Sequence, residues 1–217
     1  MKVNFNYINK KMWIVTIFMI IFALVVIPYL PSQIPCQWNS NGDAINKTNK
    51  FAILLFPIIS IAIIVLGNLV ATIDPKQIAY KKAKREYNLI CSIVIISLLI
   101  IQVYVILHAS GIITEFSKFS LIDIIPGIVI MIVGNYLPKF PQNYLTGVKT
   151  VWAYSSEDIW RKTQRFSSKL WIVCGFVIMI NGLLFQIRIR EVNILLIISM
   201  IALPRIYGFI EHYKTIK

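Results

Sequence analysis

The chain has 217 residues, of which 58% are hydrophobic and 14% are charged, and its formal net charge is +13. Its mean hydropathy is +0.73. Soluble domains contain about 45–50% apolar and about 25% charged residues, so this chain has more apolar surface than a core of its size can bury. The composition excludes a cytosolic enzyme, a secreted disulfide scaffold and a disordered tail. It predicts a single integral membrane domain over residues 1–217.

Six apolar stretches are long enough, or nearly so, to cross a bilayer as helices, because a spanning helix requires about 20 mostly apolar residues. They occupy residues 12–30, 51–73, 89–111, 121–137, 170–187 and 194–210. The fourth and the sixth are short or interrupted. The predicted fold class is therefore all-α, a polytopic membrane helix bundle with six transmembrane helices.

Lysine and arginine are distributed unevenly between the two sides of this predicted bundle. The side with both termini carries 17 of them and the opposite side carries 5. Short cytoplasmic loops are enriched in Lys and Arg, which predicts cytoplasmic N and C termini. The Ile, Asn and Lys bias suggests a bacterial genome, so we expect a bacterial cytoplasmic membrane. We interpret the positive charge as attraction to anionic membrane lipids rather than direct binding of nucleic acid.

The predicted extracellular loop, residues 31–50, follows the first span directly. Pro31 and Pro35 favour an extended backbone, and Asn39 and Gly42 favour a turn. Trp38 suits the boundary between lipid and water. We expect a loop that lies along the membrane surface. It is either a surface that meets a hydrophobic ligand or a rigid connector, and the spacing alone favours the connector.

The predicted cytoplasmic loop, residues 138–169, begins with turn-forming Pro138, Pro141 and Gly147. Ser155 and Asp158 resemble the start of a capped helix. That helix would be amphipathic and lie at the inner membrane interface, with its cationic side toward anionic lipid. Its apolar stripe would contain Ile159, Trp160, Thr163 and Phe166, with Arg161, Lys162 and Arg165 elsewhere. The alternative is a basic anchor that leads into the fifth span.

The chain has no catalytic motif, and we predict no catalytic, cofactor or metal site. His108 and His212 fall on opposite sides of the membrane in this topology, and the three cysteines are widely spaced. Ionisable residues within spans are candidates for function. His108 and Asp123 lie near the outer ends of consecutive spans and could pair. One such pair does not define a catalytic site, so we do not expect an enzyme.

The two loops resemble the SDP-immunity (SdpI-like) family of bacterial multi-pass membrane proteins. The outer loop is similar to the small DUF1648-like domain of that family, whose pattern is L-P-x-x-[IV]-P-x-H-[FW]-N-x-x-G followed by Lys. The matching residues are Leu30, Pro31, Ile34, Pro35, Trp38, Asn39, Gly42 and Lys50.

The inner loop carries the more specific resemblance, to G-N-Y-L-x-K…N-Y-x-x-G-[IV]-[RK]-T-x-W…S-x-E-x-W-x-[KR]-T. The matching residues are Gly134, Asn135, Tyr136, Leu137, Lys139, Asn143, Tyr144, Gly147, Val148, Lys149, Thr150, Trp152, Ser155, Glu157, Trp160, Lys162 and Thr163. Two family histidines are replaced, by Gln37 and Gln164. The resemblance therefore does not carry over any role that requires an imidazole at these positions.

The resemblance implies immunity to a secreted hydrophobic peptide toxin, with a cytosolic transcriptional repressor captured at the membrane. The candidate toxin-contacting residues in the outer loop are Pro31, Pro35, Gln37, Trp38, Asn39, Gly42 and Lys50. The candidate switch or partner residues in and beside the inner loop are Asn135, Asn143, Gly147, Lys149, Thr150, Trp152, Trp160, Arg161, Thr163 and Arg165.

Two other functions remain open from the sequence. A small transporter or exporter component would have a hydrated site lined by Gln102, Asp123 and Asn181. A lipid-binding scaffold would have no peptide ligand, and its loss would not alter survival under toxin challenge.

Overall fold

The structure is a computed structural model that describes residues 10–38, 44–73, 82–112, 121–144, 146–184 and 190–216. The helices are α1 (Lys11–Val26), α2 (Leu55–Ile73), α4 (Lys84–Ala109), α5 (Leu121–Tyr136), α6 (Glu157–Leu183) and α7 (Arg190–Ile216). Three short 3-10 helices, η1 (Ile27–Tyr29), η2 (Lys50–Leu54) and η3 (Leu137–Lys139), adjoin α1, α2 and α5. Six helices among the described residues are long and apolar enough to cross a membrane, which confirms the predicted fold class.

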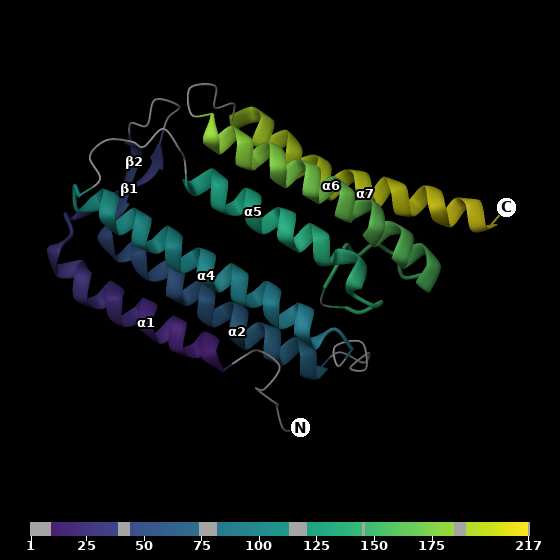
Figure 1. Cartoon of the computed structure of the whole chain (residues 1–217), viewed down its shortest axis with the longest axis horizontal. Coiled ribbons are helices and arrows are strands. Elements are labelled where there is room, and N and C mark those ends of the chain that lie inside the picture. Colours follow the sequence, from purple (N-terminus) through teal and green to yellow (C-terminus); the bar gives the residue numbers. More distant parts are fainter. Residues whose placement is uncertain are drawn as a thin grey trace.

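The helices form two groups of three, as Figure 1 shows. The first bundle contains α1, α2 and α4, and the second contains α5, α6 and α7. The groups meet where α4 contacts α5, and the most extensive helix contact of the molecule is between α5 and α6. The contact between α4 and α5 therefore forms the main seam between the bundles, and Phe140 after η3 also packs with residues of the first bundle.

The outward faces of both bundles are apolar. Ile14 on α1 is 69% exposed and Leu195 on α7 is 65% exposed, and many other large aliphatic side chains are also exposed. Soluble monomers rarely display apolar surface on this scale, because water does not solvate it favourably. Lipid must cover these faces, and the chain is a multi-pass membrane protein.

Buried polar contacts join the helices of the first bundle. The hydroxyl groups of Thr16 on α1 and Ser60 on α2 lie 2.6 Å apart. The Nε2 atom of Gln102 on α4 donates to the carbonyl oxygen of Met19 on α1 at 3.1 Å. All three polar side chains are fully buried. In a membrane such hydrogen bonds tie helices together, because lipid offers the same groups no partner.

Glycines allow α5 and α6 to approach closely. A methyl group at Gly127 would lie 2.6 Å from the backbone nitrogen of Met179, and one at Gly175 would lie 2.7 Å from the carbonyl oxygen of Gly127. Gly134 and Gly182 are equally crowded. Small residues at a helix interface permit backbone contact, which is a common basis of packing in membranes. The second bundle therefore depends on this stripe of glycines.

The outer motif forms a β-hairpin that the all-α prediction did not include. Strand β1 (Gln33–Trp38) pairs antiparallel with β2 (Ala44–Asn49), and the register shifts after Pro35. Proline lacks the N–H that a ladder needs, so it is tolerated at such an irregularity. Ile34 is 2% exposed and packs with Leu30, Ile53 and Val105, which fixes the hairpin to the ends of the first bundle.

Of the two alternatives for residues 157–169, the structure shows the segment that leads into the fifth span, and the separate amphipathic helix at the membrane interface is wrong. Residues 157–169 are the first part of α6, which continues into the fifth span. Helix α6 has 27 residues and so is about 40 Å long, whereas the hydrocarbon core is about 30 Å thick. Its N-terminal turns therefore extend past the lipid.

The start of this helix also differs from the prediction. The N-cap is Ser156, whose side chain accepts a hydrogen bond from the backbone N–H of Ile159, and not Ser155. Trp160 and Thr163 face protein, with exposures of 1% and 0%. These side chains cannot lie in lipid headgroups, because the loop and α7 cover them.

We predict that Gly127→Leu weakens the second bundle by about 3 kcal/mol, since the added side chain collides with backbone atoms that cannot move aside. The measurement is the thermal unfolding midpoint of the purified protein in detergent. Ile128→Leu is the matched control, because Ile128 is 41% exposed on the same helix. Equal unfolding midpoints for the two variants would contradict the close packing.

Candidate functional site

The two sequence motifs lie at opposite ends of the helices (Figure 1). The hairpin end carries β1 and β2, and the loop end carries residues 140–156 together with the first turns of α6 and the last turns of α7. We call residues 140–156 the loop cap. The two motifs therefore form two separate candidate sites.

At the hairpin end, Lys50 closes the base of the hairpin. Its backbone N–H donates to the carbonyl oxygen of Ser32 at 3.2 Å, and its Nζ atom lies 3.5 Å from the carbonyl oxygen of Leu30. Pro31 is exposed and Pro35 is half-buried. Gln37 and Trp38 belong to β1, whereas the predicted turn residues Asn39 and Gly42 lie outside the described residues.

At the loop end, two side chains of α6 hold the loop cap. The indole N–H of Trp160 donates to the carbonyl oxygen of Phe140 at 3.0 Å. The amide of Gln164 accepts from the N–H of Val148 and donates to the carbonyl oxygen of the same residue, both at 2.9 Å. Gln164 is fully buried. This two-point contact satisfies both backbone groups of a loop residue, as a neighbouring strand would.

Asn143 organises the first turn of the loop cap. Its Oδ1 atom accepts from the backbone N–H of Thr146 at 2.7 Å, and its Nδ2 atom donates to the carbonyl oxygen of Pro141 at 2.6 Å. The hydroxyl group of Tyr154 donates to the carbonyl oxygen of Asn143 at 2.9 Å. An Asn side chain commonly forms turns in this way. Asn143 is 2% exposed, so its role is to shape the loop.

Gly147 provides the positive φ that this path requires. Its φ is +94°, and a methyl group there would lie 2.8 Å from Oε1 of Gln164 and 3.1 Å from the ring of Trp160. Only glycine adopts this conformation without strain. The glycine therefore allows Val148 to reach Gln164.

Helix α7 forms the other side of the loop end. The ring of Trp152 contacts Phe209 edge to face at 5.2 Å between centroids, and Phe166 stacks on Tyr207 at 4.4 Å. Nζ of Lys162 lies 3.2 Å from the carboxylate of Glu211. These contacts join the loop cap, α6 and α7 into one packed unit.

Two threonines contact α7 where Gly208 brings it close to the loop cap and to α6. A methyl group at Gly208 would lie 3.3 Å from the hydroxyl oxygens of both Thr150 and Thr163. The hydroxyl group of Thr150 also accepts from the N–H of Ala153 at 2.9 Å. Thr150 and Thr163 are therefore packing residues of the loop end.

The structure divides the ten inner candidates into two kinds. The residues that build the loop cap or hold it from α6 are buried or half-buried, and they are Asn143, Gly147, Thr150, Trp152, Trp160 and Thr163. The exposed ones belong to Asn135, Lys149, Arg161 and Arg165. Val151, which the sequence analysis did not select, is 82% exposed. Only the exposed residues can touch a partner without the loop unfolding.

Sequence reasoning missed several residues that complete the loop end. Gln142 donates through Nε2 to the carbonyl oxygens of Ala153 and Tyr154. Helix α7 contributes Phe209, Glu211 and His212. The ring of His212 lies 3.0 Å from the hydroxyl oxygen of Ser155. No spacing in the sequence signals these contacts, because α7 is far from the loop along the chain.

The polar residues of the transporter alternative are divided between the two bundles. Gln102 belongs to the first bundle, where it contacts Met19. In the second bundle, Asn181 donates to Asn193 at 3.0 Å, and Asn193 donates to Asp123 at 3.4 Å. The ring of His108 packs near Tyr104. The contact that the structure describes for Asp123 is thus with Asn193, which was not a candidate.

Metal ligands do not cluster in the part of the chain that the structure describes. It contains no group of three or more His, Cys, Asp or Glu residues that could hold a metal ion. Cys36 is exposed, and Cys91 and Cys174 are buried, and all three are free thiols.

The six apolar helices define a multi-pass membrane protein, and the loop end is formed by its carboxyl-terminal part. Residues 139–209 match the SdpI/YfhL protein family. Residues 14–61 match the Domain of unknown function (DUF1648), and this region contains the hairpin. These two matches confirm the resemblance to the SDP-immunity family.

Among curated proteins, the chain is similar to the protein named Immunity protein SdpI of Bacillus subtilis (strain 168). The two are 28% identical over 194 residues, which cover 89% of this chain and 90% of that protein. The similarity therefore extends over both bundles. No solved structure matches the chain.

We predict that Gln164→Ala destabilises the loop cap by about 2 kcal/mol or more, because it leaves the buried N–H and carbonyl groups of Val148 without partners. The measurement is hydrogen exchange at the amide of Val148, which should become faster. Arg165→Ala, an exposed neighbour on the same helix, is the control and should leave this exchange rate unchanged. Unchanged exchange in Gln164→Ala would contradict the role of the amide.

Proposed function

We propose that this protein confers resistance to a secreted hydrophobic antimicrobial peptide in a bacterial cytoplasmic membrane. The observation that carries the proposal is the similarity over 89% of the chain to a protein named Immunity protein SdpI. The packed loop end supports it, because its contacts are made by residues of the matched SdpI/YfhL region. Immunity requires no catalytic group, which agrees with our expectation that the protein is not an enzyme.

We further propose that the loop end is cytoplasmic and the hairpin end extracellular. The excess of Lys and Arg on the side of the loop end supports this orientation. A hydrophobic peptide that reaches the cell from outside would then meet the hairpin first. Ile34 anchors the hairpin to the helix ends, so its exposed residues would be held at the lipid boundary.

The orientation can be tested with the native thiol of Cys36, which is exposed on β1. We predict that a membrane-impermeant maleimide labels Cys36 in intact cells. In a Cys36→Ser background, Val151→Cys should react only after the cells are permeabilised, because Val151 is 82% exposed at the opposite end. Cys91 and Cys174 are buried and provide the background signal. Labelling of both positions in intact cells would refute the orientation.

The proposed mechanism has a second part at the loop end. Lys149, Arg161 and Arg165 are exposed and positively charged, so they suit contact with an acidic surface of a cytosolic transcriptional repressor. Trp160 and Thr163 are buried and would act only by holding the loop cap. We infer that toxin binding at the hairpin end favours the form of the loop end that captures the repressor.

We predict that expression of this chain protects a sensitive bacterium against at least one peptide in a panel of secreted membrane-active peptides. Lys149→Gln/Arg161→Gln/Arg165→Gln should abolish capture of the repressor, because it removes the exposed positive charges. It should leave unchanged the amount of protein in the membrane and the survival of cells exposed to the peptide. Trp38→Ala should reduce survival instead.

Lys10→Gln/Arg205→Gln is the control, because it removes exposed charges that lie away from the loop cap. Protection against no peptide in the panel would refute the immunity function. If the triple variant captured the repressor normally, the proposed docking surface would be wrong although immunity could stand.

A further inference from the structure

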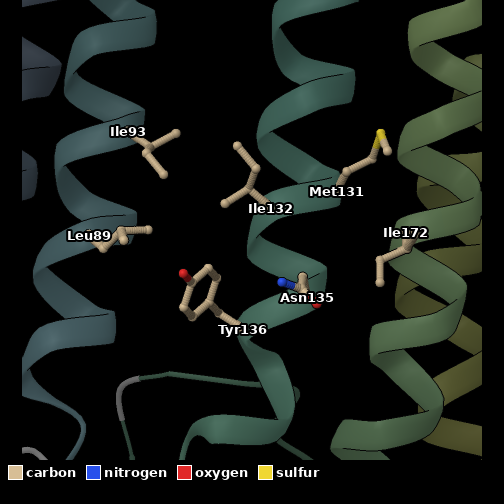
Figure 2. Close-up of a pocket in the computed structure, with 7 residues that line it drawn as sticks. All are labelled: Leu89, Ile93, Met131, Ile132, Asn135, Tyr136 and Ile172. Atoms are coloured by element: carbon tan, nitrogen blue, oxygen red, sulfur yellow. The ribbon is translucent and has the colours of Figure 1, made fainter.

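An open groove follows the seam between the two bundles. Its wider section has a volume of about 530 Å³ and lies between α4, α5 and α6. Figure 2 shows Leu89 and Ile93 of α4 facing Ile132 and Tyr136 of α5 across this space. A narrower section of about 210 Å³ continues between α4 and α5 and shares Ile93. Ile96, Ile100 and Ile128, which line the narrower section, are exposed at the apolar surface of the bundles.

The walls of the groove are regular apolar stripes. On α4 the lining residues recur every three or four positions, as Leu89, Ile93, Ile96, Ser97 and Ile100. On α5 they recur in the same way, as Ile125, Ile128, Val129, Ile132 and Tyr136. Residues at this spacing share one face of a helix. The hydroxyl group of Ser97 donates to the carbonyl oxygen of Val94 on its own helix. This hydroxyl group therefore does not need a hydrogen-bond partner from a ligand in the groove.

The length of the groove matches one leaflet of a membrane. From Leu89 to Ile100 the axis of α4 rises by about 17 Å, at about 1.5 Å per residue. Half of a hydrocarbon core of about 30 Å is about 15 Å. A single fatty acyl chain that extends from the loop end toward the middle of the membrane would therefore occupy the groove from end to end.

The loop end of the groove is polar and positively charged. Asn135 is exposed beside Tyr136, and Nζ of Lys139 lies 4.2 Å above the ring of Tyr136. On the facing helix, Arg85 precedes Leu89 by four residues, so it lies on the same stripe one turn further out. Arg85 and Lys139 are both exposed. Two cations thus lie at the mouth of an apolar groove.

We propose that this groove binds an anionic phospholipid from the leaflet at the loop end. The acyl chain lies between α4 and α5, and Arg85 and Lys139 contact the phosphate and the anionic headgroup. The amide of Asn135 is placed to bind headgroup oxygens. This inference does not depend on the proposed immunity function, and it assigns the lipid a place in the seam that joins the two bundles.

A peptide helix fits the same space poorly. An α-helix with its side chains is about 10–12 Å wide, so about seven residues would occupy roughly 800 Å³. The narrower section, which spans a similar length of α4 from Ile93 to Ile100, has about 210 Å³. The two positive charges also favour a phosphate over an apolar peptide.

The test is native mass spectrometry of the full-length protein in mild detergent, with phosphatidylglycerol and phosphatidylcholine that carry identical acyl chains. We expect phosphatidylglycerol to bind several-fold more tightly. Arg85→Gln/Lys139→Gln should weaken its binding by roughly tenfold or more, because each basic residue near an anionic headgroup contributes to binding. Ile96→Trp/Ile128→Trp should fill the groove and weaken the binding of both lipids.

Two controls separate this site from general effects of charge and bulk. Lys10→Gln/Arg205→Gln removes two exposed charges from α1 and α7, and Val173→Trp adds bulk to a lipid-facing position that is 60% exposed. Both should bind phosphatidylglycerol as the unchanged protein does. If the groove-filling pair fails to fold, Ile100→Phe is the substitute.

Three results would overturn the proposal. The first is equal binding of the two lipids, and the second is equal loss of binding in the charge variant and its control. The third is displacement of lipid by a hydrophobic peptide that Ile96→Trp/Ile128→Trp no longer binds, which would make the groove a peptide site.

Discussion

The absence of water inside a bilayer constrains every part of this structure. A polar group in hydrocarbon must find its partner within the protein, which is why the spans are helices and why irregular backbone occurs at their ends. The same constraint explains the polar pairs between helices, such as the buried pair of Thr16 with Ser60 and the half-buried pair of Asn181 with Asn193. Where hydrogen bonds are not involved, as between α5 and α6, glycines bring the backbones into contact. The bundles are held by polar pairs and close packing, because apolar side chains gain little by leaving lipid.

At the loop end, polar backbone groups also find hydrogen-bond partners within the protein, although this end lies outside the hydrocarbon core. The loop cap has little regular secondary structure, so side-chain amides replace the partners that a helix or a sheet would supply. Gln164 holds Val148, Asn143 shapes the first turn and Gln142 binds the last. A loop held at so many points keeps its shape. The contact that we propose with a repressor would therefore involve side chains that the loop cap exposes, such as Lys149.

The division into two bundles gives the seam a special place. The hairpin is anchored to the first bundle by Ile34, whereas the loop cap is packed against α6 and α7 of the second. The contact between α4 and α5 and the packing of Phe140 against the first bundle both connect the hairpin end to the loop end. A lipid bound in the groove between α4 and α5 would stabilise one arrangement of the two bundles relative to others, since a ligand favours the arrangement that it binds best.

Hydropathy predicted the six spans, and the two motifs marked the segments that form the hairpin and the loop end. They did not predict that α6 is continuous, that Trp160 and Thr163 are buried, or that the outer motif is a hairpin. The reason is physical. Hydropathy indicates whether a segment favours lipid or water, whereas the residues that pack against one side of a helix depend on contacts between parts of the chain that are far apart in sequence. Gln164 reaches Val148 across 16 residues, and Asp123 meets Asn193 across 70. The sequence by itself determined the membrane environment and the class of protein, and the tertiary structure decided which candidate residues are buried by packing and which are exposed.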